Sequence, residues 1–382
     1  MNRKISRRQF IGIAGTTLAA IGTTGYLLSD KHSVERNDIA PEDVARDDRN
    51  VDRNGVLQPH ENAILSLASL APSGHNTQPW FVQRLEAWHW IIGNDQTKWL
   101  PAVDPTQRET MLSLGAFAQN LELAAAHFGY VCDWKLLART NQDDRVLEVN
   151  LFSKTTPTFD IETIKTRRSV RSHFESEVLQ KADVKSLINS QAEFVHYLPA
   201  TSRESQWLDT QTVEANRLQA YRDAAQRELA DWIRFSSADA IKHRDGLTTA
   251  SMEIEGAAGW AVRNFYGKAN VMKTDFREKN IEKVRQEVAQ SAGWIVIASK
   301  DESVASLLET GRRLQRLWLQ VREKSIAIHP MTQILEEDST HRVLDRTLGI
   351  GAPIQFLLRV GYVKNYPAPV SLRRPVGWFV RT

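Results

Sequence analysis

Apolar residues recur with two different periods along this chain, and together they predict a mixed α+β protein. In the segments 111–130 and 304–327, apolar residues return every three or four positions, which is typical of a helix with a buried face. Short, mostly apolar runs without that period predict buried strands. These runs are 88–92, 146–151, 294–298 and 354–360. A predicted strand therefore precedes and follows each helical segment.

Residue identities indicate that the two helical segments are related. Four identical pairs lie 196 positions apart: Gly115 and Gly311, Gln119 and Gln315, Leu121 and Leu317, and Leu123 and Leu319. Since strands flank both helices in the same order, we predict two diverged α+β copies, residues 57–155 and 156–382, fused in one chain as a pseudo-dimer. Such a chain has less need to dimerise, so we expect a monomer.

Composition excludes several classes of function. The 382 residues are 42% hydrophobic and 25% charged, which is ordinary for a globular protein. A net charge of +3 and the absence of a basic, aromatic stripe argue against a nucleic-acid partner. The single cysteine, Cys132, cannot form an internal disulfide, and the ten histidines show no paired spacing, so we expect no metal site.

The first thirty residues have the pattern of a targeting segment. A basic region precedes a mildly apolar run, and "SRRQFI" (residues 6–11) resembles the twin-arginine export signal. An ordinary secretory signal or a plain membrane anchor has a similar outline, and no clear cleavage site ends the run. We expect residues 1–30 to engage the twin-arginine export machinery. The protein would then be periplasmic or attached to the outer face of the cytoplasmic membrane.

Two polar motifs interrupt the apolar pattern. "APSGHNTQPW" (residues 71–80) places many hydrogen-bonding groups between a helix and a strand. "TRRSVRSHF" (residues 166–174) holds three arginines close together, and guanidinium groups form bidentate hydrogen bonds with phosphate. A solvated basic turn is the alternative interpretation of the second motif. Residues 31–56 are charged and lack periodicity, which predicts a linker or a wrapping arm.

Both motifs resemble those of the nitroreductase family, whose fold binds FMN between two subunits. "GAFAQNL", "GRRLQRLW" and the late strand ending in Gly361-Tyr362 add to the resemblance, which covers most of residues 57–380. With the leader and the fused copies, the chain resembles most the twin-arginine-exported, Acg-type branch of FMN-binding nitroreductase-like proteins. The resemblance implies a nitroreductase-like fold.

The resemblance also implies an FMN site shared by the two copies. The phosphate and ribityl chain would be held by Arg167, Arg168, Ser169 and Arg171. The ring would be contacted from the first copy by Pro72, Ser73, Gly74, His75, Asn76 and Gln78, with His75 at a variable position of the motif. Pro330 and Met331 are expected against the ring. Arg373 and Arg374 would complete the phosphate site, unless this pair lies in an exposed tail.

A reciprocal site would need the same motifs in exchanged copies. The arginines before Leu57 form no Arg-Arg-Ser cluster, and the segment taken as the second copy's loop, "TSRESQW" (residues 201–207), lacks the asparagine and the Pro-Trp pair. We therefore expect one FMN per chain.

Two functions are compatible with these observations. The resemblance implies an FMN-dependent oxidoreductase with two-electron chemistry, fed by a small-molecule or protein electron donor; no catalytic acid, base or nucleophile stands out. The alternative is a non-catalytic protein that sequesters an occluded FMN, because NAD(P)H is not freely available outside the cytoplasmic membrane. A weaker third reading is a membrane-linked redox subunit. Residues 230–275 are expected to be a helical insertion, either a lid or a helix pair packed on the core.

Overall fold

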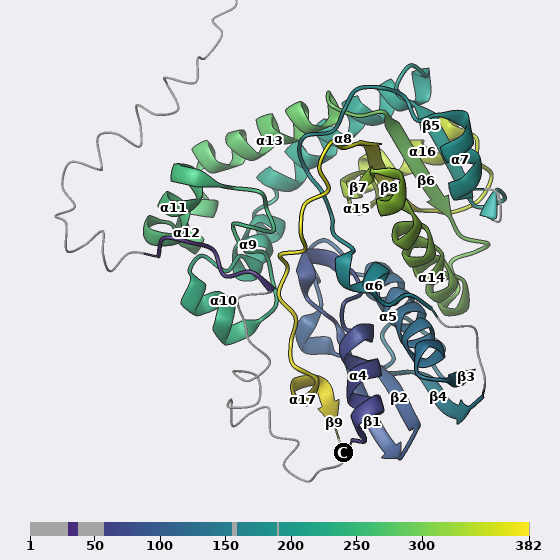
Figure 1. Cartoon of the computed structure of the whole chain (residues 1–382). Coiled ribbons are helices and arrows are strands. Elements are labelled where there is room, and N and C mark those ends of the chain that lie inside the picture. Colours follow the sequence, from purple (N-terminus) through teal and green to yellow (C-terminus); the bar gives the residue numbers. More distant parts are fainter. Residues whose placement is uncertain (1–29, 37–56, 155–158, 189–190, 382) are drawn as a thin grey trace, which may run out of the picture.

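The computed structural model describes residues 30–36, 57–154, 159–188 and 191–381. The predicted signal therefore lies outside the described residues except for Asp30. Among the described helices, none combines the length and apolar character needed to cross a membrane. The chain forms two sheets, each covered by helices, with the long helices α5 (Arg108–His127) and α14 (Val304–Val321) packed against each other between them (Figure 1).

The two sheets repeat one strand order. The first runs β3-β4-β2-β1-β9 and the second β7-β8-β6-β5, with every pair antiparallel except the parallel pair β1–β9. The first-sheet strands are β1 (Trp80–Glu86), β2 (His89–Asn94), β3 (Tyr130–Leu136), β4 (Arg145–Ser153) and β9 (Val380–Arg381). The second-sheet strands are β5 (Val195–Pro199), β6 (Gly293–Ala298), β7 (Ile326–Pro330) and β8 (Ile354–Tyr362). The four strands predicted from apolar runs are thus confirmed as β2, β4, β6 and β8.

Glycines allow α5 and α14 to touch backbone to backbone. A Cβ on Gly115 would lie 2.1 Å from the Leu308 carbonyl oxygen, and one on Gly311 would lie 1.9 Å from that of Leu112. Leu308 follows Leu112 by 196 positions, the same offset that relates the two glycines. The contact therefore has the reciprocity of a two-fold interface.

Polar contacts between the same helices repeat this reciprocity. Gln315 Nε2 donates to Asn120 Oδ1 at 2.7 Å, and Arg316 Nη1 donates to Gln119 Oε1 at 2.8 Å. An apolar cluster that includes Trp80, Phe117 and Trp318 draws on both helices and both sheets, so the two halves share one core.

The main difference between the halves is a long excursion in the second. β1 and β2 are joined by Ala87 and Trp88. Trp88 has a φ of 64°, which suits a tight hairpin. The equivalent strands β5 and β6 are separated by residues 200–292, called the excursion below. It contains α8 (Arg203–Tyr221), α9 (Asp223–Trp232), α10 (Ser237–His243), α11 (Gly256–Phe265), α12 (Lys268–Val271) and α13 (Thr274–Val288). The insertion predicted at 230–275 is its middle part.

The topology corrects one assignment made from the sequence. Residues 201–207 begin α8, where Ser202 Oγ accepts from the amide of Ser205 at 3.1 Å. They follow β5, whereas "APSGHNTQPW" precedes the equivalent strand β1. The identification of 201–207 as the equivalent loop is therefore wrong, and the equivalent place is the segment between α7 (Lys181–Ile188) and β5.

The chain beyond β8 returns to the first half. In Figure 1 this yellow segment passes beside the excursion and ends with α17 (Val376–Phe379) and β9 on the edge of the first sheet. The remaining helices are short or peripheral. They are α4 (Pro59–Ala68), α6 (Glu162–Thr166), α15 (Gln333–Glu336), α16 (Asp338–Leu348) and the 3-10 turns η2 (Gly74–Asn76), η3 (Gln96–Lys98) and η5 (Arg322–Lys324).

Candidate functional site

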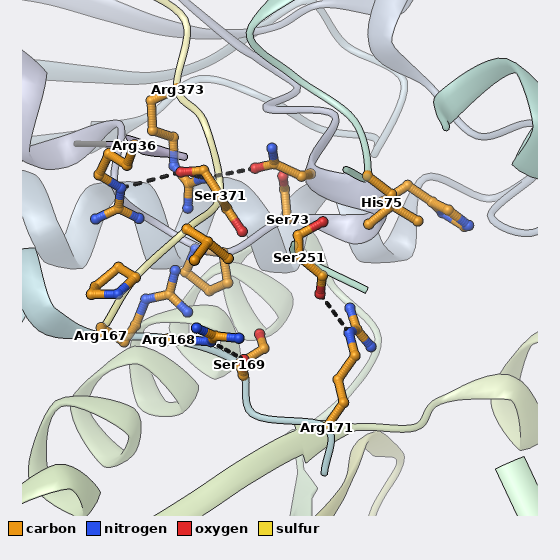
Figure 2. Close-up of a pocket in the computed structure, with 15 residues that line it drawn as sticks. Arg36, Ser73, His75, Arg167, Arg168, Ser169, Arg171, Ser251, Ser371 and Arg373 are labelled. Carbon is orange, nitrogen blue, oxygen red and sulfur yellow. Dashed lines mark hydrogen bonds between the residues drawn. The ribbon is translucent and has the colours of Figure 1, made fainter. Parts of the chain in front are cut away.

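A pocket lies where the two halves, the excursion and the C-terminal segment meet (Figure 2). It holds about 580 Å³ of empty space, part of it open to solvent. Nine of the residues selected from the sequence line it: Pro72, Ser73, His75, Asn76, Arg167, Arg168, Ser169, Arg171 and Arg373. Five do not: Gly74, Gln78, Pro330, Met331 and Arg374. The structure thus brings the two polar motifs together although they lie far apart in the sequence.

The first-half loop has an unusual backbone. His75, Asn76 and Gln78 have φ values of 47°, 55° and 54°, in the left-handed region that residues other than glycine seldom adopt. Each such residue costs on the order of 1 kcal/mol and persists only where its surroundings impose it. One restraint is local, because the amide of Gln78 donates to Ser73 Oγ at 3.0 Å.

Asn76 supplies the main restraint. Its Nδ2 donates to the carbonyls of Gly246 (3.1 Å) and Leu372 (3.2 Å), and its Oδ1 accepts from Arg373 Nη1 at 2.8 Å. The side chain thus fastens the excursion and the C-terminal segment to the loop. With both polar atoms bonded to protein, Asn76 acts as a positioning residue in the pocket wall.

Gln78 and Arg374 lie behind the pocket. Gln78 is fully buried; its Nε2 donates to the Arg244 carbonyl at 2.9 Å and its Oε1 accepts from the Arg374 amide at 2.8 Å. The Arg374 guanidinium donates to the Trp80 carbonyl at 2.9 Å. Both residues therefore anchor the C-terminal segment. Arg374 neither lines the pocket nor lies in an exposed tail. Gly74 is close to Glu109, whose Oε2 would lie 3.2 Å from a Cβ at this position.

The arginines of the second-half motif point in different directions. Arg167 is buried, donates to the Leu70 carbonyl at 3.1 Å and lies over the Trp318 ring at 4.7 Å. Arg168 pairs with Glu253 of the excursion at 3.1 Å. Arg171 Nε donates to the Ser251 carbonyl at 3.0 Å (Figure 2). Arg168 and Arg171 therefore fasten the excursion, while Arg167 lies between the two halves.

Pro330 and Met331 lie away from the pocket. Pro330 ends β7, paired with Leu358, and Met331 is buried in an apolar cluster with Leu335 and Leu357.

Six lining residues were not singled out from the sequence: Arg36, Leu247, Ser251, Pro369, Val370 and Ser371. Arg36 lies in the charged segment interpreted as a linker or arm, where nothing distinguishes it from its neighbours. Its Nε donates to the Ser371 carbonyl at 3.1 Å. Leu247 and Ser251 belong to the insertion predicted at residues 230–275.

Three guanidinium groups share one side of the pocket. Burial, together with repulsion among them, lowers the pKa of Arg167 to about 9 and that of Arg373 well below its ordinary value, and burial lowers the pKa of Arg36 to about 10. Within the part of the chain that the structure describes, no carboxylate lies at ion-pair distance from any of the three, and the buried Nε atoms of Arg167 and Arg373 have no hydrogen-bond partner. Clustered cations without a carboxylate partner suit an anion.

Two buried histidines, His75 in the pocket wall and His329 beside Arg171, add no charge at neutral pH. Burial and, secondarily, Arg171 lower the pKa of His75 to about 4, and the same causes hold the pKa of His329 well below its ordinary value. Among the described residues, no group of His, Cys, Asp and Glu side chains could hold a metal ion. The positive charge of the pocket therefore comes from arginine alone.

Comparison with known proteins identifies the family of this chain. Residues 164–362 match the family model described as the nitroreductase family. The chain is 24% identical over 336 residues to PigM of Serratia sp., named as an NAD(P)H nitroreductase, covering 82% of this chain and 90% of that protein. It is also 24% identical over 331 residues to Acg of Mycobacterium tuberculosis, similarly named, covering 82% and 93%.

Among solved structures, the FMN-dependent nitroreductase NfnB of Mycobacterium smegmatis in complex with NADPH matches with a TM-score of 0.34 and 16% identity, covering 54% of this chain and 91% of that one. Since the family model spans more than half of the chain, this protein belongs to the nitroreductase family of oxidoreductases and is Acg-like within it.

Proposed function

We propose that this protein binds one FMN in the pocket between its two halves and uses it for two-electron transfer of the nitroreductase type. The observation that carries the proposal is the pair of buried guanidinium groups of Arg167 and Arg373, which line the pocket and have no carboxylate at ion-pair distance among the described residues. A phosphate monoester carries nearly two negative charges at neutral pH and would offset this positive charge.

The rest of the pocket suits the remainder of this cofactor. Ser73, Ser169 and Ser251 provide polar groups between the paired guanidiniums and Arg171. A hydrogen bond from Arg171 Nε to the Ser251 carbonyl holds the Arg171 side chain in place. When bound, FMN would supply the electron-transfer chemistry; the chain would hold it, orient it and limit access to it. A fixed positive charge at Arg171 would favour the reduced, more negative state of the flavin.

We further propose that the chain is a fused pseudo-dimer with copies at 57–155 and 156–382, working as a monomer. The shared strand order of the two sheets and the reciprocal contacts of Gly115 and Gly311 support it. We also propose that residues 1–30 direct export through the twin-arginine route; replacing Arg7 and Arg8 by Lys should then retain the protein in the cytoplasm, and unchanged export would contradict this.

One observation favours the alternative of FMN sequestration. The excursion supplies Leu247 and Ser251 to the pocket, and Asn76, Arg168 and Arg171 all bond to it. A pocket walled in this way restricts the approach of a nicotinamide to the flavin.

The visible spectrum and flavin-to-chain ratio of the purified protein test the proposal. We expect one FMN per chain and much weaker FMN binding by Arg373→Gln. A protein that takes up no flavin on reconstitution would refute the FMN site, and two flavins per chain would refute the single site. Anaerobic NAD(P)H distinguishes the two functions: reduction of bound FMN supports the oxidoreductase, whereas FMN reduced by light but not by NAD(P)H supports sequestration.

A further inference from the structure

The described N-terminal arm, residues 30–36, is fastened to the excursion. Ser237 Oγ donates to Asp30 Oδ1 at 2.7 Å, at the start of α10. From α11, Arg263 Nε donates to the Asp30 carbonyl at 3.2 Å and Asn264 Nδ2 donates to the same oxygen at 3.1 Å. This set of bonds fixes the beginning of the arm, so the path of the following residues is determined by the excursion.

Arg36, at the end of the arm, reaches the pocket. Its Nε donates to the Ser371 carbonyl at 3.1 Å and its Nη1 to the Lys165 carbonyl at 3.0 Å. Figure 2 shows its guanidinium on the same side of the pocket as those of Arg167 and Arg373. The three arginines therefore converge from three remote parts of the chain: the arm, the second-half motif and the C-terminal segment.

This convergence is unfavourable unless an anion is present. The positive charge of Arg36 is one of the causes that lower the pKa of both Arg167 and Arg373, which means that it repels them. No carboxylate of the described residues offsets this repulsion.

We infer that Arg36 is a third phosphate-binding residue and that the arm thereby ties the excursion to a bound FMN. The inference rests on the proposed function. Because Arg36 acts on the phosphate, it contributes to the affinity for FMN and not to the affinity for riboflavin, which has the same ring and sugar chain but no phosphate. Asp30 holds the start of the arm on the excursion, whereas Arg36 holds its end at the carbonyls of Ser371 and Lys165.

The experiment measures dissociation constants of FMN and riboflavin for the full chain and its variants by quenching of flavin fluorescence. Arg36→Gln removes the charge, Arg36→Lys keeps it, and Arg342→Gln, an exposed position on α16 outside the pocket, is the matched control. We expect Arg36→Gln to weaken FMN binding at least tenfold, Arg36→Lys to recover part of that loss, and Arg342→Gln to bind as wild type. Riboflavin binding should stay within twofold in all of them.

The outcomes separate this inference from the proposed function. A wild-type protein that binds neither flavin refutes the FMN site itself. If the wild type binds FMN and Arg36→Gln has the same dissociation constant for FMN, only the role of Arg36 is refuted. An equal loss of FMN affinity in Arg36→Lys and Arg36→Gln refutes it too. If riboflavin is bound, an equal loss of riboflavin and FMN in Arg36→Gln also overturns the inference, since it would mean that Arg36 supports the pocket as a whole.

A second variant tests the arm. Asp30→Ala removes the side chain that accepts from Ser237 and leaves Arg36 in place. We expect faster FMN dissociation in stopped-flow displacement, by threefold or more, with no change for riboflavin. A wild-type FMN dissociation rate would show that the Asp30 side chain does not position Arg36.

Discussion

Gly311→Ala tests the packing that joins the two halves. The added Cβ would lie 1.9 Å from the carbonyl oxygen of Leu112 and 3.1 Å from the amide nitrogen of Ala116, whereas ordinary contact begins at 3.4 Å. Both atoms belong to the backbone of α5 and cannot rotate away. The two helices must therefore separate locally by about 1.5 Å.

The expected cost follows from three contributions. Overpacking of this kind destabilises by about 1–3 kcal/mol. Separation also strains the Gln315–Asn120 hydrogen bond, worth about 1 kcal/mol. Alanine's better helix propensity returns about 1 kcal/mol. We expect the free energy of unfolding to fall by about 2 kcal/mol, with a similar effect for Gly115→Ala. The double variant should cost less than the sum, because helices already separated by one methyl group accommodate the second.

Urea denaturation followed by tryptophan fluorescence measures these changes. Gly267→Ala is the control, because its backbone φ is −156° and nothing lies within 4 Å of a Cβ there. FMN binding should weaken in Gly311→Ala, since both halves build the pocket. A wild-type unfolding midpoint for Gly311→Ala, or full additivity of the two glycine variants, would refute the reasoning.

Three further predictions concern the loop, a buried acid and the pH dependence. Asn76→Ala loses the hydrogen bonds to the excursion and to Arg373 and places alanine at a φ of 55°. We expect the free energy of unfolding in urea to fall by about 2 kcal/mol or more and FMN binding to weaken. Asn76→Gly should recover only the backbone part of this loss, and two variants that behave as wild type would contradict the prediction. Glu61 is fully buried and accepts hydrogen bonds from the amides of Gln58 and Trp88 and from the Trp90 indole. Glu61→Ala should therefore lower the free energy of unfolding by about 3 kcal/mol in the same assay. A change below about 1 kcal/mol would show that these donors find other partners. Burial and, secondarily, Glu109 raise the pKa of Glu336 from 4.5 to about 8, so the folded state retains a proton that the unfolded state releases, and stability should fall as pH rises from about 4.5 to 8. Glu336→Gln should flatten this fall, and an unchanged dependence of the urea midpoint on pH would contradict the assignment.

The strands and long helices of the two halves could be predicted because they obey local rules. An apolar run of strand length, such as 294–298, and a helical period with glycine at the crossing, as at Gly311, are visible without knowledge of the partner segment. The pairing of the two polar motifs in one pocket was also predicted, through the family resemblance rather than through periodicity.

The remaining features depend on contacts between distant residues. Nothing near Arg36 indicates that its guanidinium meets Ser371, which lies 335 positions away. Met331 follows a strand in a position that either faces a ligand or joins a helix cluster, and only the placement of Leu335 and Leu357 decides between them. The sequence predicts an insertion shorter than the excursion, because α8 consists mostly of polar residues and the beginning of the excursion at residue 200 therefore has no apolar pattern.

The covalent link between the halves provides a physical reason to expect a single FMN site. In the shared strand order β4 corresponds to β8, so the segment after each strand leaves its half in an equivalent place. The segment after β4 leads to Arg167, and the segment after β8 leads to Arg373; both guanidiniums donate to the same carbonyl oxygen of Leu70, at 3.1 and 3.2 Å. In a symmetric dimer two such segments would serve two sites, whereas here both converge on one. The excursion reinforces the asymmetry, because it occurs only in the second half and reaches the first-half loop at Asn76. We therefore expect a flavin-to-chain ratio of one, and a ratio of two would mean that a second phosphate is held without this pair of arginines.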